Sequence, residues 1–597
     1  MMEQGCGLKR KRSYQGKDNL MTWKKIVLNF SRGAVILPVL GGIKLPRATV
    51  GHREFRLCRS WSFVVVVAVL VLWACRGLDA GEVLFRWDFE PQGVDSVGER
   101  ISTMPDGFQP GQGDGLEIAK TADRGWALHV SIPAGAPGHR NIRYMIPADR
   151  VRGKRLKVSA NIKAQGISQP PNPWNGIKCM LQIVSPGETQ WPQQNMPGGD
   201  FDWRRASFLA VIPDDVERVF LILGLENVSG DAWFDDVVIE DLGARKVPAA
   251  ATSQPVFMGH RLPRLRGAMI GPRVTDEDLL EFGQVWKANH VRWQLIWGGF
   301  PRSPADGASL KEYRDWLETA LRRLDEALPV CRKAGILVTV DLHTPPGGRD
   351  SSSACRMFQV REFQEAFVQI WEEIARRYKD SNVVWGYDLV NEPVEGAIPA
   401  GLLNWQELAT ETARRVRAID DHHAIIIEPA PWGSPSSLDL LEPLDVPGVV
   451  YSVHMYIPHS FTHQGVYNNP MGIVYPGMID GRWYDRETLK KALSPVVKFQ
   501  RDFNVHIYIG EFSAIRWAPG NSAYQYLKDC IDIFEENGWD WAYHAFREWD
   551  GWSVEHGPDP QDRRRTPELT DRAKLLRSWY SKNVAPSFSA TPETNPK

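Results

Sequence analysis

The second half of the chain alternates between strand-like and helix-like segments, and this alternation restricts the possible folds more than any other feature. The apolar, strand-like runs lie at 265–270, 291–296, 336–342, 383–390, 424–428, 449–454, 505–510 and 541–546. The charged, helix-like segments lie at 276–288, 311–334, 359–379, 405–419, 486–502, 521–537 and 566–581. Eight strand-like runs within residues 257–583 predict an α/β domain of the (β/α)8 TIM-barrel type.

A doubly wound open sheet is the main alternative for such an alternation. That fold is expected to carry a glycine-rich, phosphate-binding turn after its first strand. The residues that follow the run 265–270 read GPRVT, which is not such a turn. The sequence therefore favours the barrel.

The region before the barrel has a different pattern. Short β-rich runs, such as 83–89, 126–132 and 219–223, are separated by Gly, Pro and Asp, and no long helical pattern occurs between them. This pattern predicts a jelly-roll-like β-sandwich over residues 82–242. Residues 243–256, rich in Ala and Pro, are expected to form an exposed linker. The polar, Pro-containing tail 584–597 is expected to be disordered.

An apolar run from Phe63 to Cys75 follows a basic segment near the N-terminus. Its thirteen residues are too few for a bilayer crossing, which needs about 20, but they fit the core of a secretory signal. We predict that residues 61–81 are a signal peptide or membrane anchor, and that the protein is secreted or lies at the cell surface or in the periplasm. The sequence is compatible with two alternatives, cleavage of the signal after Ala80 and attachment of a lipid at Cys75. Residues 1–60 fit no domain, which favours a true start downstream of Met1.

Composition excludes several classes of function. The chain has 71 basic and 72 acidic residues, so it lacks the positive charge that nucleic-acid binding requires.

Its seven cysteines show neither a disulfide framework nor paired metal-ligand spacing. His454, His459 and His463 lie close together but have no acidic or cysteine partner at zinc spacing. We expect no cofactor and no metal. The 24 tryptophans indicate stacking against flat ligands, or simply a large core.

Functional side chains in a TIM barrel lie at the C-terminal ends of the strands. On the second, third, fourth, sixth and seventh strands this rule selects Arg292, Asp341, His343, Asn391, Glu392, His454, Tyr456 and Glu511. The eighth strand leads into Trp541, His544, Phe546, Arg547, Glu548 and Trp549.

Two of these residues, Glu392 and Glu511, end strands on opposite sides of the barrel mouth. Cleavage of a glycosidic bond requires such a pair, because one carboxyl group protonates the leaving oxygen while the other attacks or stabilises the sugar. Arg292 is expected to keep one carboxylate charged, and a drier pocket to keep the other protonated. Taken singly, each residue also has a structural explanation, such as an ion pair between Arg292 and Asp341.

The residues at these strand ends resemble glycoside hydrolase family 5, the cellulase family of retaining (β/α)8 glycosidases, over about residues 260–580. The matching stretches are Arg266-Gly267-Ala268, His290-Val291-Arg292-Trp293, Asp341-Leu342-His343, Tyr387-Asp388-Leu389-Val390-Asn391-Glu392-Pro393, Ser452-Val453-His454-Met455-Tyr456 and Ile509-Gly510-Glu511-Phe512.

The resemblance implies that Glu392 is the general acid/base and Glu511 the nucleophile of a retaining endo-β-glycosidase. It implies hydrolysis of β-linked polysaccharide, first of all β-1,4-glucan. Mannan, xylan, β-1,3-glucan and glycolipids are alternatives within the family. A non-catalytic glycan-binding protein is the alternative from another class.

The resemblance also implies a set of sugar-binding side chains. Asn391 matches a ligand of the sugar 2-hydroxyl, and Tyr456 matches a residue that holds the nucleophile. After strand eight, Trp549 is predicted to be the aromatic side chain on which a sugar ring stacks, and Phe546 and Trp552 are the alternatives. The implied substrate-binding positions are Arg292, His343, Asn391, His454, Tyr456 and Trp549.

The N-terminal sandwich resembles carbohydrate-binding jelly rolls, in stretches such as Trp203–Phe208 and Gly230–Val237. Such sandwiches bind glycans through exposed tryptophans, and Trp174 and Trp191 lie in Pro-rich segments where they can serve. A purely structural module is the alternative. We expect a monomer whose partner is a polysaccharide or oligosaccharide.

Overall fold

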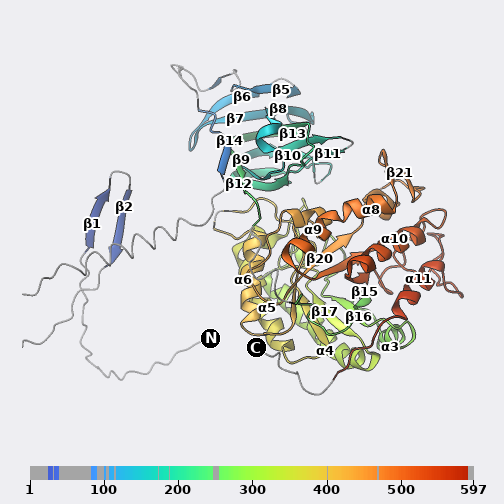
Figure 1. The fold of residues 1–597 in the computed structure, drawn as a ribbon. Helices are drawn as coiled ribbons and strands as arrows, with labels where there is room; N and C mark the ends of the chain where they lie inside the picture. The colour runs from blue at the N-terminus through green and yellow to red at the C-terminus, as the bar shows by residue number, and fades with distance from the viewer. Residues whose placement is uncertain are drawn as a thin grey trace, which may run out of the picture. The chain divides into compact units, whose positions relative to one another are not determined.

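The computed structural model describes most of the chain from Glu82 onward (Figure 1). The described ranges are 82–90, 106–112, 116–172, 174–186, 188–245, 255–399, 401–466 and 469–588, with the strand backbones at 25–30, 33–38 and 100–101. The chain divides into two units, Met1–Asp79 and Ala80–Lys597.

The first unit contains one antiparallel pair of strands, β1 (Lys25–Phe30) and β2 (Gly33–Pro38), within the segment that the sequence assigned to no domain. The predicted signal or anchor at 61–81 lies outside the described residues, as do residues 246–254 of the linker and the tail from 589. None of the helices in the described ranges has both the length and the apolar character needed to cross a bilayer.

Two antiparallel sheets precede the barrel (Figure 1), and the jelly-roll-like sandwich expected for residues 82–242 stays a prediction. One has the order β11-β10-β13-β8-β5, and the other has the order β12-β9-β14-β7-β6-β4 with β3 paired to β14. The strands are β3 (Glu82–Trp87), β4 (Arg100–Ile101), β5 (Phe108–Gln112), β6 (Leu116–Thr121), β7 (Gly125–Ile132), β8 (Gly138–Ile146), β9 (Arg155–Ile167), β10 (Gly176–Ser185), β11 (Glu188–Gln190), β12 (Gly199–Val211), β13 (Arg218–Val228) and β14 (Gly230–Asp241), with the short helix α2 (Ala148–Val151) after β8.

The two sheets enclose one hydrophobic core. Alternate residues of β9, such as Val158 and Ile162, belong to the same core cluster as alternate residues of β13, such as Leu221 and Leu223, because successive side chains of a strand point to opposite faces. Trp174 and Trp191 stay outside this core, with 58% and 50% of their surface exposed. That exposure is what sugar stacking requires, and glycan binding by these sheets stays a prediction.

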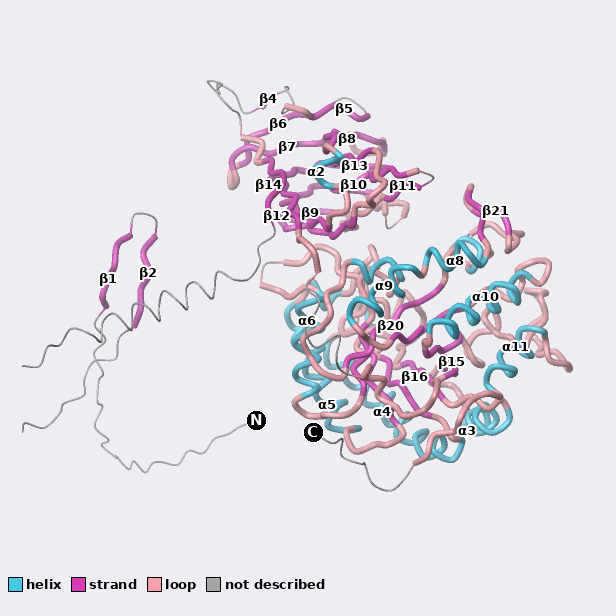
Figure 2. Tube along the Cα trace, in the orientation of Figure 1, coloured by secondary structure: helices cyan, strands magenta, loops and turns pink. Residues whose placement is uncertain are grey.

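The second domain is a closed barrel of eight parallel strands in the order β15-β16-β17-β18-β19-β20-β23-β24, which confirms the predicted TIM barrel. Figure 2 shows its helices around the strands. The strands are β15 (Arg266–Ile270), β16 (His290–Gln294), β17 (Leu337–Asp341), β18 (Val384–Asp388), β19 (Ala424–Ile427), β20 (Val449–Met455), β23 (Ile507–Phe512) and β24 (Asp540–Tyr543), and a hairpin of β21 (Gly477–Ile479) and β22 (Arg482–Tyr484) follows β20.

Several helices of the barrel begin or end at capping residues. In α4, for example, Ser309 and Glu312 form a capping box at the start, and Gly335 takes a left-handed conformation at the end. The helices are α3 (Asp276–Leu280), which continues as a π-helix at Glu281–Val285, α4 (Leu310–Ala334), α5 (Arg361–Tyr378), α6 (Trp405–Arg417), α7 (His459–Thr462), α8 (Arg486–Ala492), α9 (Ser494–Phe503), α10 (Ser522–Asn537) and α11 (Asp571–Tyr580).

Two helix predictions need correction. The single helix expected at 486–502 is divided into α8 and α9, because Pro495 has no backbone N–H to continue the first helix. The helix expected at 566–581 begins only at Asp571, where Thr570 caps it.

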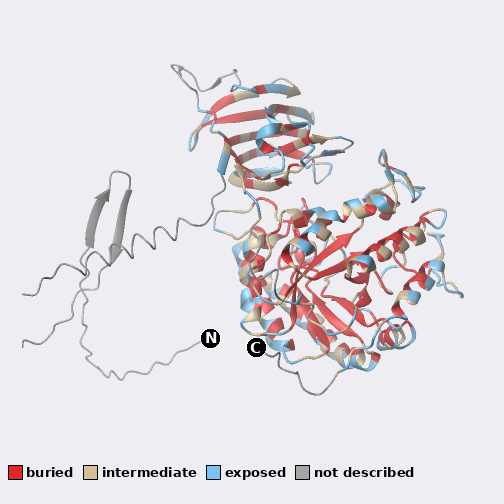
Figure 3. Ribbon diagram, viewed as in Figure 1, coloured by how far each residue is buried: buried red, intermediate tan, exposed pale blue. Residues whose placement is uncertain are grey.

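The barrel strands are buried along their whole length, as parallel strands covered by helices are (Figure 3). Several of the buried residues at their C-terminal ends are nevertheless ionisable. Arg292, Asp341, Asp388, Glu428 and Glu511 are all at most 4% exposed. Buried charges are costly unless they are paired, so this cluster marks the functional end of the barrel.

Candidate active site

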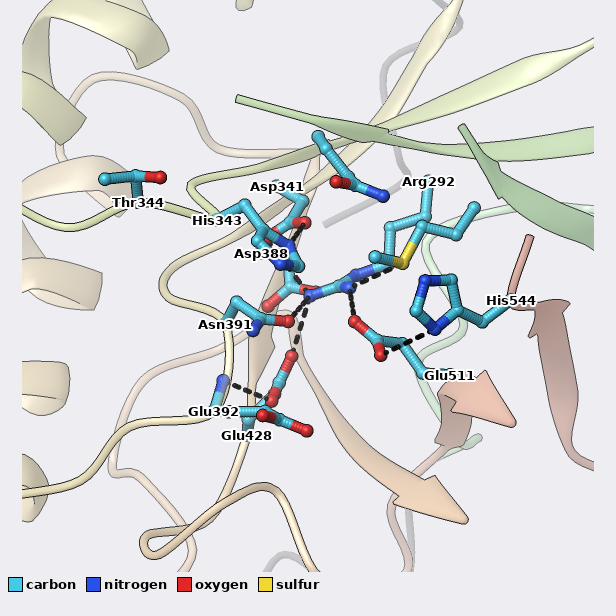
Figure 4. Close-up of polar contacts among 12 residues, drawn as sticks. Arg292, Asp341, His343, Thr344, Asp388, Asn391, Glu392, Glu428, Glu511 and His544 are labelled. Atoms are coloured by element: carbon cyan, nitrogen blue, oxygen red, sulfur yellow. Dashed lines mark hydrogen bonds and ion pairs between the residues drawn. The ribbon is translucent and has the colours of Figure 1, made fainter. Parts of the chain in front are cut away.

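Glu511 lies near the end of β23, and its two carboxylate oxygens have separate partners (Figure 4). Arg292 Nη1 donates to Oε1 at 2.7 Å, and the Tyr456 hydroxyl donates to Oε2 at 2.8 Å. His454 Nδ1 is 3.7 Å and His544 Nδ1 is 3.4 Å from Oε2. Four side chains therefore fix the position of this carboxylate.

The charges around Glu511 favour its ionised form. Burial by itself would raise the pKa of the carboxyl group, but His454, His544 and Arg292 outweigh burial and lower that pKa well below the usual range of a glutamate. A carboxylate that is ionised at neutral pH can act as a nucleophile.

Glu392 lies in the loop after β18, with its side chain 12% exposed. His454 Nδ1 lies 2.9 Å from its Oε1. Burial opposes protonation of His454, but Glu428 and Glu511 raise its pKa well above the usual value, so the ring donates to Glu392. One carboxylate oxygen of Glu392 and one of Glu511 lie within 4.8 Å of each other. The two predicted catalytic groups thus face each other across a short gap.

Arg292 connects the two sides of the site. Its fully buried guanidinium donates through Nε to Asp388 at 2.8 Å, and through Nη2 to Asn391 Oδ1 at 3.1 Å and to Glu428 at 2.8 Å. It also forms an ion pair with Asp341 at 3.1 Å. Burial, opposed by Arg292 but reinforced by Glu428 and Asp341, raises the pKa of Asp388 well above its usual range.

The remaining predicted residues lie at the edge of this cluster. His343 follows β17, and its Nδ1 lies 2.8 Å from Asp341 Oδ2. Among the aromatic rivals after strand eight, Trp549 is 39% exposed, whereas Phe546 and Trp552 are 4% and 7% exposed. Trp549 therefore presents the most surface to a ligand, and its role as the platform stays a prediction.

The sequence of residues 249–550, half of the chain, matches the family model described as cellulase, glycosyl hydrolase family 5. The chain belongs to glycosyl hydrolase family 5. It is therefore a glycoside hydrolase, as its resemblance to the family predicted.

Known relatives match part of the chain. Endoglucanase C of Acetivibrio thermocellus is 27% identical over 248 residues, which cover 37% of this chain and 71% of that protein. Cellodextrinase A of Ruminococcus flavefaciens is 27% identical over 276 residues, 44% of this chain and 76% of that protein. A crystal structure of a mutant form of Thermotoga maritima Cel5A with cellobiose has 26% identity and a TM-score of 0.41, and the match covers 53% of this chain and 96% of that one.

Glu428 was not among the residues selected from the sequence, and His544 was named only as a residue after the eighth strand, without a role. Glu428 directly follows β19, the fifth strand, so the strand-end rule would have found it had that strand been considered. His544 directly follows β24 and hydrogen-bonds to Tyr456. Beyond it lies Glu548, which accepts a hydrogen bond from Gln294 Nε2 at 2.8 Å.

Three clusters within the described ranges combine residue types that can bind metals. They are Glu392 with His454 and Glu511, His260 with His506 and Asp540, and Asp420 with His422 and His423. In the second cluster, Asp540 Oδ2 lies 2.7 Å from His260 and 2.6 Å from His506, so direct hydrogen bonds already account for the arrangement. In the first cluster, His454 Nδ1 already lies at hydrogen-bonding distance from Glu392 Oε1, 2.9 Å.

Proposed function

We propose that this family 5 enzyme is a retaining endo-β-glycosidase that hydrolyses β-1,4-glucan by double displacement. The observation that carries the proposal is the close approach of the Glu392 and Glu511 carboxylates, within 4.8 Å. Retaining glycosidases hold their two carboxyl groups about 5–5.5 Å apart, whereas inverting ones leave about 6.5–9.5 Å for a water molecule. The short gap supports retention.

In the first step, a Glu511 oxygen attacks the anomeric carbon as the glycosidic C–O bond breaks. Glu392 gives its proton to the departing oxygen, so a neutral alcohol leaves and a glycosyl ester remains on Glu511. Arg292 and Tyr456 support this step because each donates a hydrogen bond to a different oxygen of Glu511 and so fixes the attacking group.

In the second step, Glu392, now a carboxylate, takes a proton from a water molecule whose oxygen attacks the same carbon. The ester bond to Glu511 breaks, the sugar leaves with retained configuration, and both glutamates return to their starting protonation. His454 supports both steps, because its hydrogen bond to Glu392 Oε1 keeps that carboxyl group directed at the gap.

The choice of β-1,4-glucan as substrate is supported by the relatives. Several carry the name endoglucanase, and one is a cellodextrinase. Family 5 members that act on mannan, xylan, β-1,3-glucan or glycolipids share the barrel, so the substrate has to be measured.

Release of reducing sugar from a panel of β-glucans, mannan and xylan tests this function. We expect the greatest release from β-1,4-glucan. We expect Glu392→Gln to lower it by about 10²- to 10⁴-fold, because the amide cannot protonate the leaving oxygen. Release from mannan or xylan alone would contradict the glucan assignment. A protein that binds these polymers but releases nothing would be the non-catalytic glycan-binding protein.

A further inference from the structure

Glu428 is a third glutamate at the centre of the site, and both of its oxygens are used (Figure 4). Oε1 accepts a hydrogen bond from Arg292 Nη2 at 2.8 Å and lies 3.1 Å from His454 Nε2. Oε2 accepts the backbone N–H of Glu392 at 2.8 Å. The side chain is fully buried, so its negative charge is offset only by these neighbours.

Glu428 is connected to the proposed acid/base residue, Glu392, in two ways. The first is direct, through the backbone N–H of Glu392, a residue held at a φ of +46°, which is strained for a side chain other than glycine. The second passes through His454, whose Nε2 faces Glu428 while its Nδ1 contacts the Glu392 carboxylate. Glu428 thus holds Glu392 at its backbone and, through the imidazole, at its side chain.

The nucleophile side depends less on Glu428. Without Glu428, Arg292 would keep its contacts with Asp341, Asp388, Asn391 and Glu511. The Glu392 N–H and His454 Nε2, by contrast, would each lose a carboxylate at hydrogen-bonding or ion-pair distance. Loss of Glu428 should therefore disturb the acid/base more than the nucleophile.

Helix α6 and the loop after β19 both contribute to the position of Glu428. Trp405 Nε1 donates to the backbone carbonyl of Glu428 at 2.7 Å. Gly433, at a φ of +58°, lies so close that a Cβ there would be 2.7 Å from Glu428 Oε2 and 3.5 Å from the His454 ring. A glycine at this place leaves room for the carboxylate to reach the Glu392 N–H.

We propose that Glu428 is a positioning residue that aims the acid/base Glu392 at the leaving oxygen. The inference rests on the proposed function, because it assigns Glu428 a part in the protonation step of that reaction. A misdirected acid slows only those reactions whose leaving group needs a proton, so the effect of Glu428 should depend on the leaving group.

The test compares Glu428→Ala and Glu428→Gln with the wild-type enzyme on two substrates. One is a cello-oligosaccharide, whose leaving alcohol needs protonation, and the other is 2,4-dinitrophenyl β-cellobioside, whose leaving group departs without it. We expect kcat/KM of Glu428→Ala to fall about 10²-fold or more on the oligosaccharide and less than about tenfold on the aryl glycoside. Glu428→Gln keeps an acceptor for the Glu392 N–H and should fall between Glu428→Ala and wild type.

A second variant tests the inference without removing the carboxylate. Gly433→Ala should displace Glu428 and show the same leaving-group dependence. Gly481→Ala is its matched control, because Gly481 has a similar φ of +78° and nothing within 4 Å of an added Cβ. Equal losses on both substrates, or unchanged kcat/KM in folded Glu428→Ala, would overturn the inference alone. A wild-type enzyme inert toward both compounds would contradict the proposed function and the inference with it.

Discussion

Glu511→Ala is expected to lower hydrolysis of β-1,4-glucan by about 10⁴-fold or more, the largest loss of any single substitution in the site. The Glu511 carboxylate, whose pKa the neighbouring charges lower against the effect of burial, is held in place by Arg292 and Tyr456. Without it, no group remains at that position to form the glycosyl ester. The measurement is the initial rate of reducing-sugar release at saturating substrate.

Binding should survive this change. His343 and Asn391 do not depend on Glu511 for their main contacts, since they are held by Asp341 and Arg292 respectively. Titration of Glu511→Ala with a cello-oligosaccharide should therefore give a Kd close to that of the inactive Glu392→Gln. Glu487→Ala, at an exposed position on α8, is the control and should retain full activity. Residual activity above about one hundredth of wild type would exclude Glu511 as the nucleophile.

The barrel could be predicted from the sequence, because its strands are buried on both faces and therefore appear in the sequence as apolar runs. The limits of those runs were less accurate where a charge is buried. The seventh apolar run ends at residue 510 with Glu511 predicted at the strand end, whereas β23 continues through Glu511 to Phe512. An ionised residue is tolerated inside this strand because Arg292, distant in sequence, pairs with it. No local pattern reveals such a pairing.

The candidate site was predictable where the family motifs name its residues, and less so elsewhere. The positions of Glu392, Glu511, Arg292, His454 and Tyr456 around one gap agree with the predicted set, although their roles remain proposals. Glu428 was missed because its strand carries no distinctive motif and its importance comes from three contacts to residues on other strands.

Arg292→Met is expected to have the largest effect on stability. Removing this buried cation leaves Asp341, Asp388, Glu428 and Glu511 without their shared partner, at a cost of about 3–5 kcal/mol. Urea denaturation followed by circular dichroism measures the free energy of unfolding.

The loss of stability should depend on pH. In the variant, burial of Glu511 is no longer opposed by Arg292, so the folded-state pKa of Glu511 should rise above its unfolded value and the folded protein should bind more protons than the unfolded chain. Stability relative to wild type should then fall as the pH rises from 5 to 7. For the same reason, the acidic limb of kcat/KM should move to higher pH, because the lowered pKa of Glu511 depends in part on Arg292.

Arg572→Met provides the matched control for that experiment. Arg572 is also buried, but it donates to the backbone carbonyls of Ser553 and His556. Its removal should cost stability without a comparable dependence on pH. If the two variants lost the same free energy at pH 5 and pH 7, the four carboxylates around Arg292 would not be the source of its effect.

The configuration of the first product is the best test of whether Glu511 attacks the anomeric carbon of the sugar. Proton NMR can follow the anomeric signals of a cello-oligosaccharide during the first minutes of hydrolysis, before mutarotation mixes the anomers. We expect the β-anomer to appear first, because two successive displacements restore the starting configuration. Initial appearance of the α-anomer would mean a single displacement by water and would contradict the assigned roles of both glutamates.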